Sequence, residues 1–290
     1  MADKRRLDDP QLWRLLWRGE EQPSARSGLT VGRIVRAGIE LADEAGLEAL
    51  SMRRVAERLG VGAMSLYTYV PGKQELVVLM VEEVHGELPT DPPAAAGATG
   101  GATDVLVGDA PADGDALAGD APADGDALAG GDRGESQPGW RAGLRRMAEE
   151  YWDLYQRHEW LLDVPLTRPA TGPNLMDRYE RDIALVDGIG LDEFEMTATI
   201  ELIYEHVAGA ARRLRAIRRD AEASGLSDEE WWYRLLPTLN QLLADRNYPV
   251  TSRVGEALSA PHLDTGYLFH FGLERILDGI EAHIARRRAG

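Results

Sequence analysis

The sequence predicts an all-α protein built from two helical units, and three observations lead to that prediction. Apolar residues recur every three or four positions along several stretches, which is the spacing of one buried helix face. Residues that cap or end helices, chiefly Ser, Asp and Gly, flank those stretches. At 290 residues the chain is long enough for about two domains, each with its own core.

Residues 1–28 are expected to form an arm that contains one short amphipathic helix, because a proline stands where its first turn would begin. Two interpretations of this arm stay open. In one, Trp13 and Trp17 pack on the C-terminal domain or the arm stays mobile. In the other, Arg18 and Arg26 reach a binding partner.

The most informative stretch spans residues 50–76, where two short helical patterns are joined by a glycine-containing turn. Ser51 is placed to cap the first helix, because a serine hydroxyl accepts a free N–H of the first turn. Gly60 ends that helix where a left-handed residue is needed. A second helix is expected over residues 63–70, with Leu66 in the core. This unit is a helix-turn-helix, a motif that usually binds DNA.

Residues 86–139 are rich in Gly, Ala, Asp and Pro and contain few large apolar side chains. The sequence GDAPADGDALA occurs at 108–118 and again at 119–129. Prolines and glycines in each copy oppose a continuous helix, so this composition predicts a disordered insertion. Calcium-binding repeats are the alternative, although one Asp-x-x-x-Asp-x-Asp per copy is a sparse set of ligands.

Residues 140–290 show helical patterns throughout. Asp192, followed three residues later by Glu195, has the spacing of a capping box at the start of a long helix. That explanation is simpler than a metal site for these carboxylates. Three arginines at 286–288 suit the C-terminus of a last helix. The expected helices span residues 140–158, 174–188, 192–223, a segment that begins near 227, and 264–288.

Three sequences carry a family resemblance: IVRAGIELADEAG at 34–46, SMRRVAERLGV at 51–61 and SLYTYVPGKQEL at 65–76. They resemble the tetracycline-repressor-like (TetR) family of bacterial transcription regulators, among which the pattern LYxYVxxKxxL is specific. A weaker resemblance lies in residues 167–169, Thr-Arg-Pro, and in FGLERILDGIE at 271–281. The resemblance implies a three-helix DNA-binding domain with the helix-turn-helix over residues 29–85. It also implies a helical ligand-binding and dimerisation domain over residues 140–290.

The resemblance assigns the contacts with double-stranded operator DNA. It places Ala63 and Ser65 in the groove and the hydroxyls of Tyr67 and Tyr69 on phosphates, unless one tyrosine only packs against the first helix. Because Ala63 and Met64 are apolar, thymine-methyl contacts and DNA shape are expected to supply more of the specificity than hydrogen bonds. In the arm, arginine insertion into a minor groove is the DNA-binding interpretation. The expected DNA-binding residues are Arg26, Arg53, Ala63, Met64, Ser65, Tyr67, Tyr69 and Lys73.

The net charge of −17 argues at first against a nucleic-acid partner, because phosphate binding is electrostatic. More than half of that charge lies in residues 85–139, which carry 11 acidic residues and 1 basic residue. The helix-turn-helix is locally basic, with three arginines and Lys73 against Glu57 alone between residues 53 and 73. These local cations are therefore expected to attract the DNA.

A homodimer is expected, because one helix-turn-helix reads only half of a palindromic operator. The helices at 192–223 and 264–288 are the candidates for a four-helix bundle between two copies. Small residues at 207–211, Val-Ala-Gly-Ala-Ala, support close helix approach, although the same run could pack inside one subunit.

The resemblance also implies a mostly apolar effector pocket edged by a few polar groups. Tetracycline repressor holds a drug-bound magnesium through histidine, whereas this chain has Val164 or Pro165 and Glu205 at the matching places. Magnesium–tetracycline is therefore not expected, while a large aromatic or polyketide-like effector stays open. The effector is expected to tilt the helix at 74–87 and so move the DNA-binding domain. The expected effector-binding residues are Met147, Tyr151, Leu175, Tyr179, Asp182, Ile200, Tyr204 and Glu205.

Other classes of protein find little support in the sequence. There is no nucleophile motif, phosphate-binding glycine loop or HExxH metal signature, so no enzyme, cofactor or metal is expected. The chain has no cysteine, no apolar run of about 20 residues and no signal peptide, which predicts a cytoplasmic protein without a membrane partner. A helical protein-interaction module with a degenerate helix-turn-helix is the alternative. The expected function is a ligand-responsive repressor, with an exporter as a candidate regulated gene.

Overall fold

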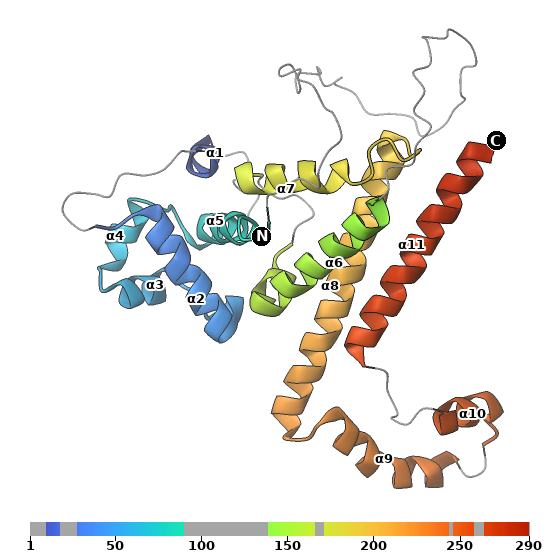
Figure 1. Ribbon diagram of the computed structural model, residues 1–290. Coiled ribbons are helices and arrows are strands. Elements are labelled where there is room, and N and C mark those ends of the chain that lie inside the picture. Colours follow the sequence, from blue (N-terminus) through green and yellow to red (C-terminus); the bar gives the residue numbers. More distant parts are fainter. Residues whose placement is uncertain are drawn as a thin grey trace, which may run out of the picture.

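Every regular element in the part of the chain that the structure describes is a helix, which confirms the all-α prediction (Figure 1). In Figure 1 the helices form an N-terminal group and a C-terminal group that lie side by side. The computed structural model describes residues 10–17, 28–89, 139–165, 171–243, 246–257 and 264–289.

The N-terminal group contains the expected helix-turn-helix. The Ser51 hydroxyl accepts a hydrogen bond from the Arg54 N–H at 3.2 Å and so caps α3 (Met52–Leu59), the first helix of the motif. Gly60 ends that helix with φ = 68°, a left-handed conformation that favours glycine. Both predictions are therefore confirmed. The helices are α2 (Val31–Ala49), α3 (Met52–Leu59), α4 (Ala63–Tyr67) and α5 (Lys73–His85).

The recognition helix α4 is shorter than the expected helix over residues 63–70. It covers five residues, and the N–H groups of Tyr69 and Val70 both donate to the Leu66 carbonyl at 2.9 Å in the closing turn. Pro71 explains this early end, because a proline disfavours the helical conformation at the residue before it. Leu66 and Val70 are fully buried, as expected.

The C-terminal group contains the expected long helices together with two short elements that the sequence did not indicate, η1 and α10. The capping box at the start of α8 is confirmed: the Glu195 N–H donates to Asp192 at 2.9 Å and the Asp192 N–H donates to Glu195 at 3.0 Å. The elements are α6 (Trp140–Arg157), the 3₁₀ helix η1 (Glu159–Asp163), α7 (Pro173–Ala184), α8 (Glu193–Ser224), α9 (Asp228–Leu243), α10 (Pro249–Ala257) and α11 (Thr265–Ala289).

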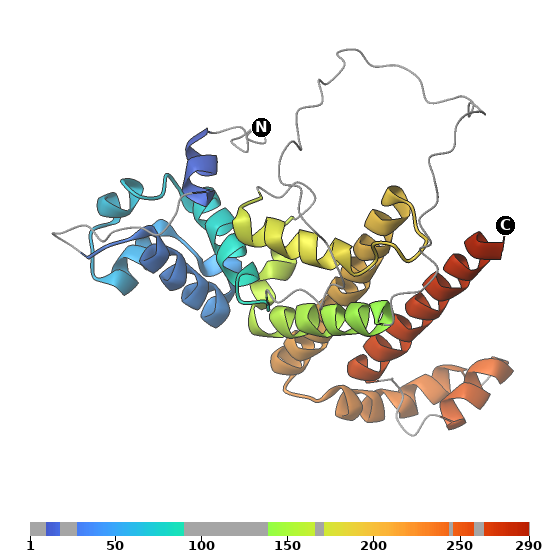
Figure 2. The same ribbon diagram turned by 45° about the horizontal axis from the view of Figure 1, so that its top comes forward.

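Helix α8 is the axis of the C-terminal group, because α6 and α11 both pack along it. Helices α9 and α10 extend beyond this bundle from the ends of α8 and α11 (Figures 1 and 2). No residue of α9 is buried, and Trp231, Tyr233 and Leu242 are exposed on it. A single apolar core runs from α2 and α5 into α6 and α8, so the two groups of helices share one interior.

Helix α1 (Pro10–Leu16) packs on α5 and buries Leu12 and Leu16. The Trp17 indole donates to the Thr171 carbonyl at 3.0 Å, which ties the arm to the C-terminal group. Because Trp17 is 55% exposed, this contact is a hydrogen bond rather than burial, and the packing interpretation of the arm stays a prediction. Arg18 and Arg26, like the repeat segment at 90–138, lie outside the described residues. Within the described parts, no helix is long and apolar enough to span a bilayer.

Candidate nucleic-acid interface and effector site

The outer face of α4 presents side chains that a DNA groove could receive. Met64 is 79% exposed and Tyr67 is 47% exposed, and Ser65 is exposed between them. Leu66 points the other way, into the core, and holds the helix against α3. Ala63 is half-buried at the first position of the helix. The surface is apolar and hydroxylic, which suits contact with thymine methyl groups and phosphates.

Tyr67 and Tyr69 differ in their surroundings. Tyr69 is half-buried and packs against the core, whereas Tyr67 extends into solvent. The alternative in which one tyrosine packs is therefore favoured for Tyr69. Tyr67 remains the better candidate for a phosphate contact through its hydroxyl.

The basic residues around the motif are not equally available to phosphates. Arg58 pairs with Glu44, and also with Glu40 at 3.4 Å, on α2. The Lys73 ammonium donates to the Leu47 carbonyl at 3.0 Å, near the end of α2. These two cations hold α3 and α5 to α2, so they have structural partners that the sequence did not indicate.

Arg53 is the more accessible cation. Its Nε lies 2.8 Å from Glu57 Oε1 one turn along the same helix, and the two side chains are 84% and 60% exposed. An exposed pair of this kind contributes little to stability, so a phosphate can replace the glutamate at small cost. The predicted contact at Arg53 therefore fits the geometry.

A buried polar cluster lies between α6, α7 and α8, where several predicted effector residues meet. Asp182 is fully buried, and its Oδ2 accepts from Tyr204 at 2.8 Å, from Arg178 Nε at 2.9 Å and from Tyr151 at 3.2 Å. The two tyrosine rings meet edge to face, with centroids 4.8 Å apart. Three helices thus converge on one carboxylate.

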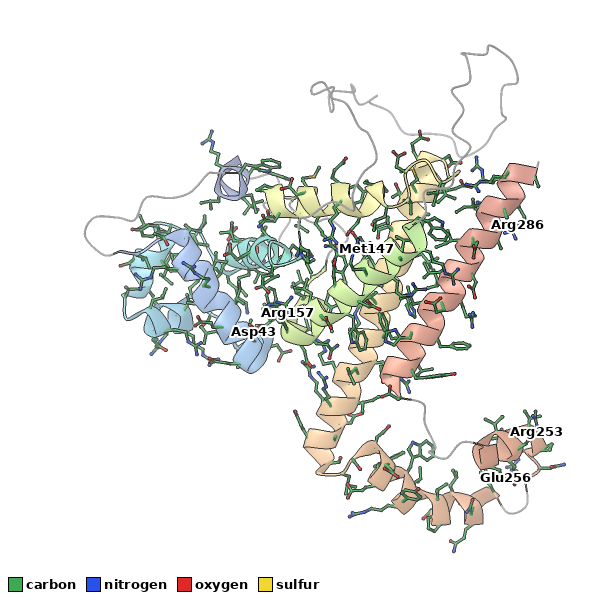
Figure 3. All side chains as sticks on the ribbon, viewed as in Figure 1. Asp43, Met147, Arg157, Arg253, Glu256 and Arg286 are labelled. Carbon is green, nitrogen blue, oxygen red and sulfur yellow. The ribbon has the colours of Figure 1, made fainter. Side chains whose placement is uncertain are left out.

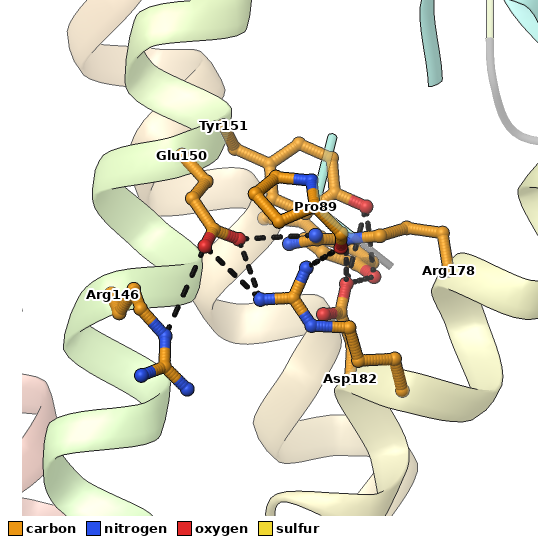
Figure 4. Close-up of polar contacts among 8 residues, drawn as sticks. Pro89, Arg146, Glu150, Tyr151, Arg178 and Asp182 are labelled. Atoms are coloured by element: carbon orange, nitrogen blue, oxygen red, sulfur yellow. Dashed lines mark hydrogen bonds and ion pairs between the residues drawn. The ribbon is translucent and has the colours of Figure 1, made fainter. Parts of the chain in front are cut away.

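Arg178 of α7 extends the cluster toward Glu150 of α6 (Figure 4), and Arg181 reaches the same glutamate. Arg178 Nη1 lies 3.0 Å from Glu150 Oε2, and Arg181 Nη2 lies 2.9 Å from the same oxygen. The Arg178 guanidinium also stacks over the Tyr151 ring, 4.7 Å from its centroid. Two buried arginines therefore balance the carboxylates of Glu150 and Asp182.

Three polar atoms of this cluster have no hydrogen-bond partner among the described residues. They are Asp182 Oδ1, Arg178 Nη2 and Arg181 Nε, all buried. A buried polar atom without a partner costs about 1–3 kcal/mol. The cluster thus holds one unpaired acceptor and two unpaired donors, which polar groups of a bound ligand could satisfy.

Burial fixes the protonation of the cluster. It raises the pKa of Asp182, although Arg178 and Tyr204 oppose that shift. It also raises the pKa of Tyr151 and Tyr204 well above the ordinary phenol value. Both phenols therefore keep their protons and serve as donors.

The remaining predicted effector residues divide into two sets. Met147 and Ile200 are fully buried beside the cluster, and Leu175 is half-buried against the core; Figure 3 marks Met147 on α6. Tyr179 is 38% exposed on α7 and Glu205 is exposed on α8, so neither faces the buried cluster. Their predicted contacts with effector remain untested.

Sequence reasoning missed Glu150, Arg178 and Arg181. The available signal was the i, i+4 spacing of Arg178 and Asp182, which places both side chains on one helix face. Such pairs are usually solvated, so the pattern alone could not indicate a buried site.

His85 was also missed, and it links α5 to the cluster. It is buried, its Nδ1–H donates to the Val81 carbonyl at 2.7 Å, and its ring centroid lies 6.2 Å from that of Tyr151. Burial lowers the pKa of this imidazole, which therefore stays neutral near neutral pH.

A second buried residue of α5, Glu82, caps the N-terminus of α7. Its carboxylate accepts backbone N–H bonds from Gly172 at 3.2 Å, Asn174 at 2.5 Å and Leu175 at 3.4 Å. The Asn174 amide donates back to the Glu82 carbonyl at 3.0 Å. Burial raises the pKa of Glu82 in opposition to these bonds. A Cβ on Gly172 would lie 2.5 Å from the carboxyl carbon, so only glycine permits this approach. A movement of α7 is therefore transmitted to α5 through Glu82.

Two further features concern metals and subunit contacts. No three histidine or acidic side chains converge as metal ligands within the described residues. An open groove of about 370 Å³ lies between α8 and α11, with a largely apolar lining that includes Leu191, Leu202 and Ile276. Phe194 and Phe271 are also exposed on these two helices. These exposed apolar residues make the face of α8 and α11 a candidate interaction surface, although Glu195, Arg275 and His283 also line the groove.

A helix-turn-helix that α5 connects to a buried polar cluster is the arrangement of a regulator that binds DNA and senses a signal within one chain. Residues 34–80 match the family described as bacterial regulatory proteins, tetR family, and residues 134–284 match the tetracyclin repressor-like C-terminal domain. The chain therefore belongs to the tetR family. It is a transcriptional repressor of this family.

Individual relatives agree with this assignment. The chain is 39% identical over 276 residues to the HTH-type transcriptional repressor DrrR1 of Streptomyces coeruleorubidus, covering 94% of this chain and 86% of the relative. It is 26% identical over 209 residues to an HTH-type transcriptional regulator of Saccharopolyspora erythraea, covering 71% and 70%. The Streptomyces coelicolor protein ActR in complex with actinorhodin shares the fold, with a TM-score of 0.60 at 22% identity over 90% of this chain and 98% of ActR.

Proposed function

We propose that the protein acts as a homodimer that binds a palindromic operator and is released from it by a small aromatic effector. The observation that carries this proposal is the connection from the buried cluster to α5. Asp182 and Arg178 lie on α7, the N-terminus of α7 is capped by Glu82, and Glu82 belongs to the helix that follows the helix-turn-helix.

The proposed dimer uses the apolar face of α8 and α11. Its groove and its exposed Phe194 and Leu202 would be covered by the same face of a second copy. Val207, Ala208 and Ala211 are buried inside one subunit, which favours the intramolecular interpretation for these small residues. Gly209 faces outward and leaves room for a partner helix.

The proposed DNA contacts come from two helices. Met64, Ser65 and Tyr67 of α4 enter the groove and hold the backbone, and Arg53 of α3 binds a phosphate. Ala63, Tyr69 and Lys73 lie beside this surface with packing or structural partners, and in the proposal they contribute through position more than through exposed donors.

The proposed effector combines aromatic rings with neighbouring hydroxyl and carbonyl groups. A hydroxyl can donate to Asp182 Oδ1, and a carbonyl can accept from Arg178 Nη2, which are two of the three open positions on α7. Tyr151, Tyr204, Met147 and Ile200 supply an apolar and aromatic wall. The ligand in the ActR structure, actinorhodin, is the natural first probe.

The proposed mechanism is a coupling between two binding equilibria. An effector that binds Asp182 and Arg178 shifts α7, and α7 in turn pulls on Glu82 and tilts α5. The two helix-turn-helix units of the dimer then lose the spacing that the operator requires. By linkage the effector lowers operator affinity by the same factor by which operator lowers effector affinity. A tenfold effect requires only about 1.4 kcal/mol of differential binding.

The test measures operator affinity by fluorescence anisotropy with and without actinorhodin, in the wild type and in Asp182→Asn. We expect the effector to weaken operator binding by about tenfold in the wild type. Asp182→Asn should abolish most of that response while operator affinity without effector changes by less than about twofold. Asp187→Asn, an exposed aspartate after α7, is the matched control.

One result would contradict the mechanism directly. If titration showed saturating actinorhodin bound to the wild type with operator affinity unchanged, the buried cluster would not control DNA binding. Control of an exporter gene stays a prediction, and mapping the operator relative to neighbouring genes tests it.

A further inference from the structure

A second joint between the two groups of helices lies at the end of α6, away from the contact between α5 and α7. His158 follows α6 and is buried. Its Nδ1 lies 2.8 Å from Asp43 Oδ1 of α2, and its Nε2 lies 3.2 Å from Glu87 Oε2, two residues after α5. Figure 3 shows Asp43 and Arg157 next to each other where α2 meets this end of α6.

The geometry defines the protonation of the ring. An ionised carboxylate can only accept hydrogen bonds, so each ring nitrogen that faces one must carry a proton. Both nitrogens of His158 face carboxylate oxygens. The imidazole is therefore satisfied on both sides only as the imidazolium cation.

The charged groups around the ring support this state. Arg157 of α6 pairs with Glu87, and the Trp160 indole donates to Asp43 Oδ1 at 2.8 Å. In η1, Glu159 and Asp163 pair with arginines of α8 at 3.0 and 2.8 Å, and so are occupied elsewhere. Glu87 thus has the Arg157 guanidinium as an ion-pair partner, Asp43 accepts from the neutral Trp160 indole, and a charged His158 supplies the cation that faces both carboxylates.

Burial acts to lower the pKa of His158, but the hydrogen bonds and charges of Asp43 and Glu87 outweigh it, and the pKa is raised. A raised histidine pKa adds stability that is fully present below the ordinary value of about 6.5 and is lost as pH rises through the raised value. The joint is therefore tight below about pH 6.5 and loosens as pH rises through the raised pKa of His158.

We propose that protonated His158 is a positioning residue that fixes the DNA-binding domain against the C-terminal domain, so that operator affinity is linked to pH through this joint. Asp43 belongs to the first group of helices, whereas His158 and Trp160 belong to the second. Loss of the proton removes one of the two hydrogen bonds that His158 makes across the boundary, to Asp43 and to Glu87. A DNA-binding domain that is held less tightly loses more conformational freedom when it binds DNA, so its affinity for the operator falls.

The first experiment reads the ring directly, with no DNA present. Nitrogen chemical shifts of the histidine rings are recorded in the full chain from about pH 5.5 to 9, and His158→Gln identifies the signal. We expect two protonated nitrogens at about pH 7 and a titration midpoint above the ordinary value. A ring with one protonated nitrogen at that pH would overturn the proposal.

The second experiment measures operator affinity over the same pH range in the wild type, in His158→Gln and in His270→Gln. His270 is exposed on α11 and serves as the matched control. The wild type and the control should lose about threefold more affinity between pH 6.5 and 8.5 than His158→Gln does. Parallel profiles for all three proteins would contradict the link.

If His158→Gln fails to fold, Asp43→Asn replaces it, because asparagine still accepts a hydrogen bond from Trp160 while it removes the charge. We expect the ring midpoint to fall in this variant. Because the ring titration needs neither operator nor effector, its failure is distinguishable from failure of the proposed regulatory function.

Discussion

At the scale of single residues, a serine hydroxyl and a left-handed glycine set the two ends of α3. Ser51 and Gly60 do what serine and glycine do at helix ends, because capping depends only on local geometry. The partners of Arg58 and Arg178 could not be predicted, because they lie on other helices or on a face whose burial depends on the whole fold. Exposure of Met64 and burial of Leu66 separate function from packing within one short helix.

Substitution of Glu82 should destabilise the contact between α5 and α7 more than substitution of any other residue there. Glu82→Gln removes the negative charge from an acceptor of three backbone N–H groups. We expect a loss of about 1.5–3 kcal/mol in the free energy of unfolding, measured by denaturant titration. Glu83→Gln, at an exposed position on the same helix, should change it by less than about 0.5 kcal/mol. Equal stability of the two variants would argue against a tight joint.

Arg53 offers a test of phosphate binding. Arg53→Gln should weaken operator binding and reduce the slope of log affinity against log salt concentration by about 1 for each phosphate that the variant no longer binds. Because Arg53 is exposed and pairs only along its own helix, stability should stay the same. An unchanged salt slope would remove Arg53 from the interface.

At the scale of elements, the long helices and the capped helix α3 were predictable, whereas η1 and α10 were not. Helices α6, α8 and α11 carry several turns of periodic apolar residues, so their patterns are strong. Helix α4 is shorter than expected because of Pro71, η1 has only five residues, and the residues of α10 whose burial is described are all exposed, so α10 has no buried apolar face to recognise. The buried cluster depends on three helices meeting, which periodicity within each helix cannot show.

The recognition helix allows function and packing to be separated by two neighbouring changes. Leu66→Ala should cost about 2–5 kcal/mol of stability, because a fully buried side chain leaves a cavity. Met64→Ala should leave stability within about 0.5 kcal/mol of the wild type. It should nevertheless lower operator affinity by about tenfold, because alanine buries less apolar surface against the DNA groove. Thermal unfolding and anisotropy measure the two effects, and a stability loss at Met64 would show that it packs.

At the scale of the whole molecule, the overall charge and the local interface point in opposite directions. The chain carries a net charge of −17, yet the face around α4 presents Arg53, hydroxyls and an apolar side chain. The sequence showed where the acidity is concentrated, but only the structure shows that Arg58 and Lys73 are engaged with α2. Operator binding should therefore depend on few cations in each subunit and on the pairing of two subunits.

The dimer is testable by one charge in the apolar groove. Leu202→Asp should shift the protein from dimer to monomer in sedimentation velocity, because a carboxylate cannot be buried there unpaired. Operator affinity should fall by more than about tenfold, since each half-site would bind alone. Met176→Asp, at an exposed apolar position on α7, is the control. A dimeric Leu202→Asp variant would place the interface elsewhere.

The complete burial of the cluster between α6, α7 and α8 limits how fast a ligand can bind there. Met147, Asp182 and Ile200 have no exposed surface, so a ligand reaches them only when helices separate. Entry that waits for such an opening is slower than diffusional encounter, however strong the final contacts are. The protein should therefore respond to a compound that persists in the cell and ignore one that appears briefly.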